Sequence, residues 1–166
     1  VGAERYARSI ALDGVQGIVT VEPADGAPLR ATVRFPKLAA LPAIIARLRR
    51  VFYLQADPVA IAAHLAQDPA LAPLVKARPG LRVPGAWSGF ELAIRAVLGQ
   101  QITVTAATRL AGRLVAAHGR RLAEPEGELT HVFPEPEALA AADLSSLGMP
   151  RSRAATLSAM AQAAIA

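Results

Sequence analysis

The chain contains no cysteine, which excludes disulfides, thiolate zinc sites, iron–sulfur clusters and cysteine nucleophiles. It has no uninterrupted apolar run of the roughly eighteen residues that a membrane-spanning helix needs. Its first residues lack the basic start and apolar block of a secretory signal. The three histidines, His64, His118 and His131, lie far apart and fit no metal-ligand spacing, so we expect them at helix ends or in loops. We therefore expect neither a metal nor a cofactor.

What the chain has in excess is apolar residues and arginine. Its 166 residues suffice for one ordinary domain or two small ones, and the 53% that are hydrophobic favour soluble helices around a packed core. The net charge is +5, and sixteen of the eighteen basic residues are arginine, whose guanidinium can bind phosphate through two parallel hydrogen bonds. This balance favours a polyanionic partner. Genomic base composition also enriches alanine and arginine together, and this second explanation stays open.

The first part of the sequence has the pattern of β-strands. Residues 30–35 alternate polar and apolar side chains, residues 17–21 are β-branched and apolar, and residues 5–12 form a third candidate strand. Asp13-Gly14 and Asp25-Gly26 mark tight turns after two of these segments. Three short strands joined by tight turns predict an antiparallel sheet in which strands adjacent in sequence are paired.

From Leu38 the apolar period changes to 3.6 residues, which predicts a helix over residues 38–52. Asp57 and Asp68 each precede a proline, a pair typical of an N-cap followed by the first helical position, so two short helices follow. Three arginines lie largely off the apolar stripe of the first helix. They form either a solvated face or a phosphate-binding one: Arg47, Arg49 and Arg50.

Residues 77–87 contain two Pro-Gly pairs and no periodicity, which indicates a domain boundary. We therefore predict an α+β domain over residues 1–78, built from a small antiparallel sheet with helices, and an all-helical domain over residues 79–166. Within the second domain we expect a polar loop over residues 120–133. Helices are predicted over residues 88–98, 103–118, 136–142 and 152–164.

The most informative motif is WSGFELAIRAVLGQQITV, residues 87–104. Ser88 and Glu91 have the spacing of a capping box, which satisfies the first free amides of a helix. Thr103 is placed to cap the next helix. The expected buried faces are Phe90, Ile94, Val97 and Leu98 in the first helix, and Ala107, Leu110, Ala111, Leu114 and Val115 in the second.

Between these two helices lies a short polar joint. We expect Gly99 to take a left-handed backbone and to end the first helix. Gln100 and Gln101 would then be held at a rigid corner between two packed helices. Amide side chains at such a corner suit hydrogen bonding to a polar polymer, and base edges are one target. The alternative is a plain helix–turn–helix corner with solvated glutamines.

Several separated blocks, in order, resemble one family across nearly the whole chain. They are YARSIALDGVQGIVTV, GLRVPGAWSGFELAIRAVLGQQITV, AGRLVAAHG and FPEPEALAAADLSSLGMPRSRAATL. The chain is similar to the alkylation-repair DNA glycosylases of the 3-methyladenine glycosylase II (AlkA) type, which belong to the helix-hairpin-helix superfamily. The resemblance implies a cytoplasmic, nucleoid-associated bacterial protein whose partner is double-stranded DNA with alkylated bases.

The resemblance also implies roles for residues of the joint. Such enzymes flip a damaged nucleotide out of the duplex and cut its glycosidic bond, because the bond is unreachable inside the base stack. Gln100, Gln101 and Thr103 would contact DNA, with the glutamines entering the minor groove and filling the gap. Gln100 and Val104 would line the neighbouring substrate pocket.

This sequence departs from the family pattern in three ways. Some members have leucine where this chain has Gln101, so an apolar wedge contact is lost. The glycine-rich hairpin and the catalytic aspartate are expected beyond Ala166, and the family's first strand and helix ahead of Val1. The chain therefore corresponds to the N-terminal domain plus the first half of the catalytic domain. We expect it to be inactive alone, with Asp143 serving as a cap or solvated residue.

The helix over residues 152–164 would lack its packing partner, which favours self-association through an exposed apolar face. Some relatives carry an alkylation-sensing transcription activator ahead of the glycosylase, so the chain could belong to a regulator fusion. A non-catalytic DNA-binding or assembly module is the remaining alternative. Membrane association is disfavoured, because the arginines are scattered rather than gathered on one amphipathic helix.

Overall fold

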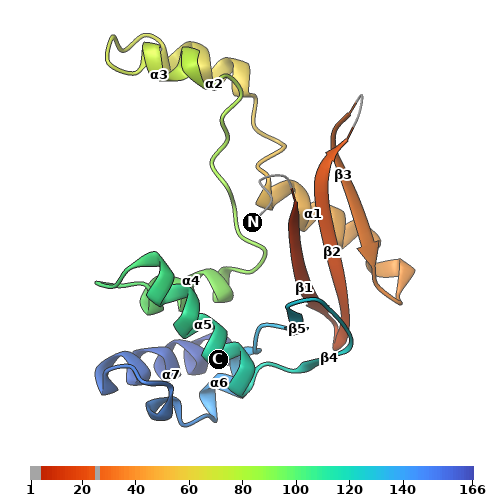
Figure 1. Ribbon diagram of the computed structural model, residues 1–166, viewed down its shortest axis with the longest axis vertical. Helices are drawn as coiled ribbons and strands as arrows, with labels where there is room; N and C mark the ends of the chain where they lie inside the picture. Colours follow the sequence, from red (N-terminus) through yellow and green to blue (C-terminus); the bar gives the residue numbers. More distant parts are fainter. Residues whose placement is uncertain (1–4, 25–26) are drawn as a thin grey trace. The chain divides into compact units, whose positions relative to one another are not determined.

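Three strands form an antiparallel sheet in the order β1-β2-β3 (Figure 1). The structure is a computed structural model that describes residues 5–24 and 27–166. β1 spans Tyr6–Leu12, β2 spans Val15–Ala24 and β3 spans Ala27–Arg34. The three predicted strands and their antiparallel pairing are confirmed, and so is the α+β class. The predicted turn at Asp25-Gly26 lies outside the described residues.

The turn at Asp13-Gly14 is confirmed, and its backbone explains the residues found there. Asp13 has a φ of 50° and Gly14 a φ of 76°. Two successive left-handed residues are what a two-residue type I′ hairpin needs, and Asp-Gly is a preferred pair for it. The turn fixes a register in which Leu12 pairs with Val15 and every earlier residue of β1 pairs in step.

Residues 120–133 contain a second β-hairpin, so the predicted polar loop is wrong, as is the expectation that the second half is all helical. β4 spans Arg121–Glu126 and β5 spans Leu129–His131, and Gly127 turns between them with a φ of 54°. Charged residues and Pro125 obscure the strand pattern in the sequence. The hairpin is stabilised instead by tertiary contacts, which local patterning does not report.

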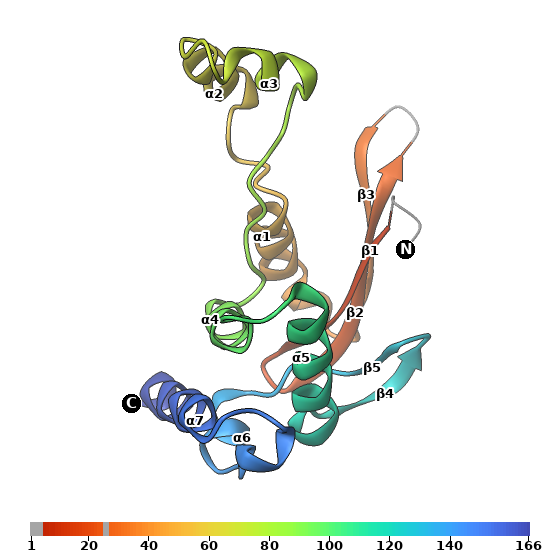
Figure 2. The ribbon, with the colours of Figure 1, turned by 60° about the vertical axis from the view of Figure 1, so that its left-hand side comes forward.

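This hairpin joins the sheet to the helices that follow. Leu122 and Val132 are buried together with Ile18 of β2. The hydroxyl of Ser9 donates to the carbonyl of His131 over 2.7 Å. Figure 2 shows β5 beside β1 and β4 beside β2. The described residues up to Ala39 therefore form one compact unit with residues 90–166.

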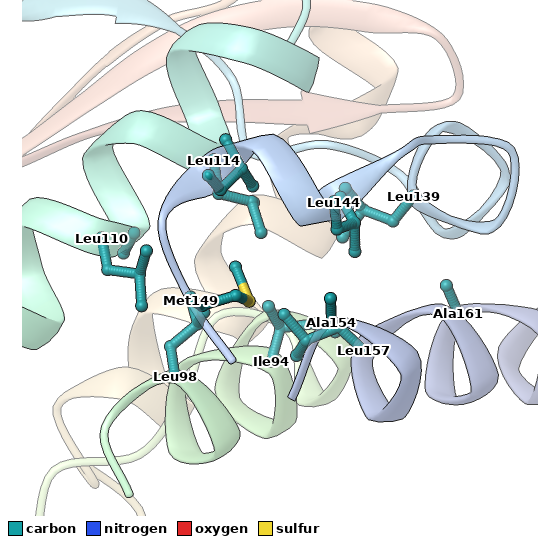
Figure 3. Close-up of a cluster of buried hydrophobic side chains, with 12 residues drawn as sticks. Ile94, Leu98, Leu110, Leu114, Leu139, Leu144, Met149, Ala154, Leu157 and Ala161 are labelled. Atoms are coloured by element: carbon teal, nitrogen blue, oxygen red, sulfur yellow. The ribbon is translucent and has the colours of Figure 1, made fainter. Parts of the chain in front are cut away.

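The helical part of that unit closes around one apolar core (Figure 3). Its helices are α4 (Gly89–Leu98), α5 (Val104–His118), α6 (Pro136–Ala140), the 3-10 helix η2 (Leu144–Leu147) and α7 (Arg151–Ile165). The predicted faces are confirmed in their central residues, which are buried: Ile94, Leu98, Leu110, Ala111 and Leu114. Phe90, Val97 and Val115 are only partly buried against the core, and Ala107 is partly buried outside it. The side chains that meet in the core include Ile94, Leu98, Leu110, Leu114, Leu139, Leu144, Met149 and Leu157.

α7 has a packing partner within the chain, which corrects the expectation of an uncovered face. Ala154, Leu157 and Ala161 are all buried in this core, because they follow one another at helical spacing on the face of α7 that packs against α6 and η2. An uncovered apolar face of α7 therefore no longer supports self-association, which stays a prediction.

Residues 40–89 form a second compact unit. The predicted helix over residues 38–52 is divided into the 3-10 helix η1 (Leu38–Ala40) and α1 (Leu41–Val51). α2 (Pro58–Leu65) begins at Asp57, whose carboxylate accepts from two backbone amides, as predicted. Asp68 caps the turn that precedes α3 (Ala72–Ala77). The domain boundary near residue 78 stays a prediction.

Two of the arginines on α1 have structural partners inside this second unit. Arg47 stacks its guanidinium over the Trp87 ring, 5.4 Å from the ring centroid. Arg50 donates to the carbonyls of Ala86 and Trp87 over 3.1 and 2.8 Å. These contacts fix the irregular segment that precedes α4. Within the part of the chain that the structure describes, no helix has the length and hydropathy to cross a bilayer.

Candidate nucleic-acid interface

The joint between α4 and α5, residues 99–103, is a tight turn held by backbone bonds at both ends. The amide of Gly99 donates to Arg95 over 3.0 Å, and that of Gln100 donates to Val97 over 3.3 Å. On the other side the Thr103 hydroxyl accepts from the amide of Ala106 over 3.2 Å, so the predicted N-cap is confirmed. The joint therefore has few ways to move without losing a hydrogen bond.

The left-handed residue of the joint is Gln101, with a φ of 57°, and the prediction for Gly99 is wrong. Gly99 instead continues the last turn of α4. A Cβ there would lie 3.3 Å from the carbonyl oxygen of Arg95 and 3.8 Å from the Cβ of Ala107. The contact with Ala107 would be an ordinary van der Waals contact and only the Arg95 carbonyl would be slightly crowded, so the approach of α5 does not require glycine here. The left-handed conformation costs a non-glycine residue about 1–2 kcal/mol, so the joint stores backbone strain at a glutamine.

The side chains of the joint face outward. Gln100, Gln101 and Thr103 are all exposed, and Val104 on the first turn of α5 is 84% exposed. Figure 1 shows this segment at the edge of the helical part of its unit. An incoming polymer can therefore reach both glutamine amides. Val104 lies on an open surface, so its assignment to a pocket wall stays a prediction.

The sequence segments that contain the joint and the helix bonded to it are rich in arginine and poor in acids. From residue 92 to residue 123 the chain has five arginines and no aspartate or glutamate, and residues 144–166 add two more arginines with no acid. One of these, Arg153 of α7, donates from Nη2 to the backbone carbonyl of Gln100 over 2.7 Å. The acids of the second half lie mainly between residues 124 and 143. The segments on either side of the joint thus carry an excess of positive charge, and Arg153 lies at the joint itself.

Glu91 at the start of α4 belongs to an ion-pair cluster, and its predicted capping box with Ser88 stays a prediction. Its Oε2 accepts from Arg8 Nη2 over 2.6 Å and its Oε1 from Arg95 Nε over 2.8 Å. Burial raises the pKa of this carboxyl, but the two guanidiniums outweigh burial and hold the pKa below its ordinary value. Glu91 is therefore an ionised structural residue that fixes α4 against β1.

Asp143, as predicted, is a cap. Its Oδ1 accepts from the hydroxyl and the amide of Ser145 over 2.6 and 2.9 Å, at the start of η2. The hydroxyl bond, followed by the amide bond, keeps the pKa of Asp143 low. The Asp143 carboxylate therefore stabilises the start of η2. Among residues 5–24 and 27–166, no three His, Asp or Glu side chains gather as a metal site would require.

Two contacts at this surface were missed from the sequence. The Arg8–Glu91 pair joins residues from different predicted domains, and the Arg153–Gln100 bond joins residues 53 positions apart. Neither has a local spacing signal. The sequence offers one indirect signal for the Arg153 contact. Arg153 lies in the first turn of its helix, where the helix dipole disfavours a cation, so a compensating partner is to be expected.

The fold is shared with solved DNA glycosylases. The 3-methyladenine DNA glycosylase of Archaeoglobus fulgidus matches with a TM-score of 0.81 at 23% identity, over 98% of this chain and 56% of that one. The 8-oxoguanine glycosylase/lyase of Clostridium acetobutylicum, in complex with double-stranded DNA, matches with a TM-score of 0.68 at 16% identity, over 93% and 54% of the two chains.

Residues 1–88 match the AlkA N-terminal domain, and the chain belongs to that family. It is 41% identical over 155 residues to a probable bifunctional transcriptional activator/DNA repair enzyme AlkA of Mycobacterium tuberculosis, which covers 93% of this chain and 31% of the relative. It is 40% identical over 168 residues to DNA-3-methyladenine glycosylase 2 of Escherichia coli, which covers 96% and 55%. The chain thus spans between a third and about half of the curated relatives it matches.

Proposed function

We propose that this chain is part of a DNA glycosylase that removes alkylated bases of the 3-methyladenine type from duplex DNA. In this proposal the joint of residues 99–103 enters the minor groove. The observation that carries it is that two exposed amide side chains project from a hydrogen-bonded, strained turn between two helices of the core. The local excess of arginine and the glycosylase relatives support the same conclusion.

The geometry suits insertion into a duplex. Flipping one nucleotide leaves a gap, and unstacking costs a few kcal/mol that an inserted side chain partly offsets. Gln100 and Gln101 can fill the gap and hydrogen-bond base edges with their amides. Because α4 and α5 are fixed by Leu98, Leu110 and Leu114 in the core, the turn cannot retreat when it meets the DNA.

The test of binding is a titration of the 166-residue chain against a short duplex that contains an abasic-site analogue, followed by fluorescence anisotropy. We expect binding that weakens steeply between about 50 and 200 mM salt, since phosphate contacts release counterions. The double variant Gln100→Ala/Gln101→Ala should lose about tenfold in affinity or more, in line with the loss of two base-edge or stacking contacts. Gln162→Ala is the matched control, because Gln162 is an exposed glutamine near the other end of α7.

Two results of that titration contradict the proposal. One is the absence of binding at low salt. The other is an equal loss of affinity in Gln162→Ala and the double variant, which would mean that the joint has no special place in the interface.

We also propose that residues 1–166 do not release alkylated bases by themselves. The departing base leaves a cation that a carboxylate would stabilise. Glu91 is held by two arginines and Asp143 by Ser145, so each already has a structural role. The required carboxylate is expected beyond Ala166. Incubation with alkylated duplex DNA and chromatography of free base should show no release, and clear turnover would contradict this part of the proposal.

A second candidate is that the chain belongs to a regulator that combines transcription activation with repair. The observation in its favour is the name of the M. tuberculosis relative at 41% identity. The sequence of the gene ahead of Val1 tests it directly. A metal-binding or helix-turn-helix domain there would support the regulator, and a start codon a short distance upstream would contradict it.

A further inference from the structure

A single arginine connects α7 to the joint. Arg153 Nη2 donates to the backbone carbonyl of Gln100 over 2.7 Å, across 53 residues of sequence. The start of α7 is anchored next to it, because Ala154 and Leu157 are buried in the core. The donor is an ionised guanidinium on a helix whose backbone is fixed by the core, and such charge-assisted hydrogen bonds are shorter and stronger than neutral ones.

Arg153 binds the carbonyl of Gln100, which directly precedes the left-handed residue Gln101. The Gln100 carbonyl and the Gln101 amide belong to one planar peptide group. The orientation of that plane sets the φ of Gln101, which is 57° and therefore unfavourable for glutamine. A bond that fixes the plane opposes relaxation of Gln101 to a negative φ, which would redirect its side chain.

The position of Arg153 is itself unfavourable for the helix. It lies in the first turn of α7, where the partial positive charge of the helix dipole disfavours a cation, and this turn holds no acid. Arg151 shares the same turn but is exposed, whereas Arg153 is partly buried beside the joint. The bond to Gln100 is thus the feature that distinguishes the two.

We propose that Arg153 is a positioning residue, which holds the Gln100–Gln101 peptide plane so that the two amide side chains project in the orientation that enters DNA. This inference rests on the proposed function for its consequence in DNA binding, but the restraint on the joint belongs to the free chain. The competing role is a direct contact to a DNA phosphate through the remaining donors of the guanidinium, and the test below separates the two.

The test compares Arg153→Met with Arg151→Met, because each removes one positive charge from the same helical turn. Hydrogen–deuterium exchange of the free chain is measured in peptides that cover residues 98–107. In Arg153→Met exchange there should accelerate by about tenfold, as expected for the loss of one charge-assisted hydrogen bond. Peptides over residues 110–118 should not change, and Arg151→Met should match the parent chain throughout. Exchange in Arg153→Met within twofold of the parent would overturn the proposal.

Affinity for the abasic duplex is then measured over a range of salt concentrations. A positioning role predicts weaker binding of Arg153→Met with an unchanged slope of log K against log salt. A slope reduced by about 0.9 would assign Arg153 to a phosphate and overturn the proposal. If the parent chain binds no duplex, the proposed function fails, while the exchange measurement still decides whether Arg153 restrains the joint.

Discussion

Arg8 Nη2 on β1 lies 2.6 Å from Glu91 Oε2 on α4, so a salt bridge links residues that are 83 positions apart. Arg95, one helical turn after Glu91, occupies the other carboxylate oxygen at 2.8 Å. The guanidinium of Arg95 also lies over the Phe133 ring, 5.4 Å from its centroid. Because α4 leads directly into the joint of residues 99–103, this cluster couples the sheet to the candidate DNA surface.

We expect Glu91→Gln to lower the free energy of unfolding by about 2–3 kcal/mol, since it leaves Arg8 without its buried counter-ion. Glu91 is buried, but the side chain of Arg95 is 46% exposed, so solvent screening keeps the loss below that of a fully buried pair. Urea unfolding followed by circular dichroism measures the change.

Arg95→Gln is the control for that variant. It removes only the partly exposed partner one turn away, so the expected loss is about 0.5 kcal/mol. Equal losses in the two variants would show that the contact between β1 and α4 adds nothing to the stability of the unit.

The same cluster predicts a pH dependence. Burial raises the pKa of Glu91, yet Arg8 and Arg95 together hold it below the ordinary value of 4.5. A carboxyl with a lowered pKa in the folded state stabilises that state above its unfolded pKa, and this contribution is lost as the pH falls through the folded pKa. The difference in unfolding free energy between the parent chain and Glu91→Gln should thus be constant above about pH 6 and shrink below 4.5.

Unfolding of both proteins at a series of pH values between about 3 and 7 measures this difference. Asp143 also has a lowered pKa, but it is present in both proteins, so its titration cancels. A difference that grows as the pH falls would contradict the assignment of Glu91 as an ionised partner of Arg8.

Local patterns predicted the elements whose structure is decided locally. The Asp13-Gly14 pair predicted the hairpin turn because few dipeptides take two left-handed residues at low cost. The helical spacing of Ile94 and Leu98 predicted their burial, and Thr103 predicted the start of α5. The existence and location of the joint could therefore be predicted before any coordinates.

Features decided by distant contacts could not be predicted. The β4–β5 hairpin has a charged, proline-containing sequence and is held by Ile18 and Ser9, which belong to the sheet. The left-handed residue of the joint is Gln101, because Gly99 still belongs to the last turn of α4 through the bond from its amide to the carbonyl of Arg95. The contact that fixes the joint comes from Arg153, on a helix that begins 50 residues later.

The burial of Ile94 predicts a large loss of stability on truncation. Ile94 is fully buried in the core of Figure 3, so Ile94→Ala should cost about 2–5 kcal/mol through lost transfer energy and a residual cavity. Leu92, two residues earlier on the same helix, is 57% exposed, and Leu92→Ala should change stability by only about 0.5 kcal/mol. Thermal unfolding of both variants distinguishes the two, and similar losses would mean that α4 buries a different face.

The strained backbone of the joint gives the sharpest prediction, because one substitution should separate stability from binding. Gln101→Gly relieves a left-handed conformation that costs about 1–2 kcal/mol, while glycine adds about 0.5–1 kcal/mol of unfolded-state entropy. The net effect on the free energy of unfolding should be a gain of roughly 0–1.5 kcal/mol. Gln100→Gly is the matched control. Gln100 is not among the left-handed residues, so this variant should lose about 0.5–1 kcal/mol.

Both variants remove an exposed amide, and both should bind the abasic duplex more weakly than the parent chain. If Gln101→Gly unfolds more easily than Gln100→Gly, the joint is not strained at Gln101. If it binds DNA as tightly as the parent, the conformation has no connection with the amide that we place in the minor groove.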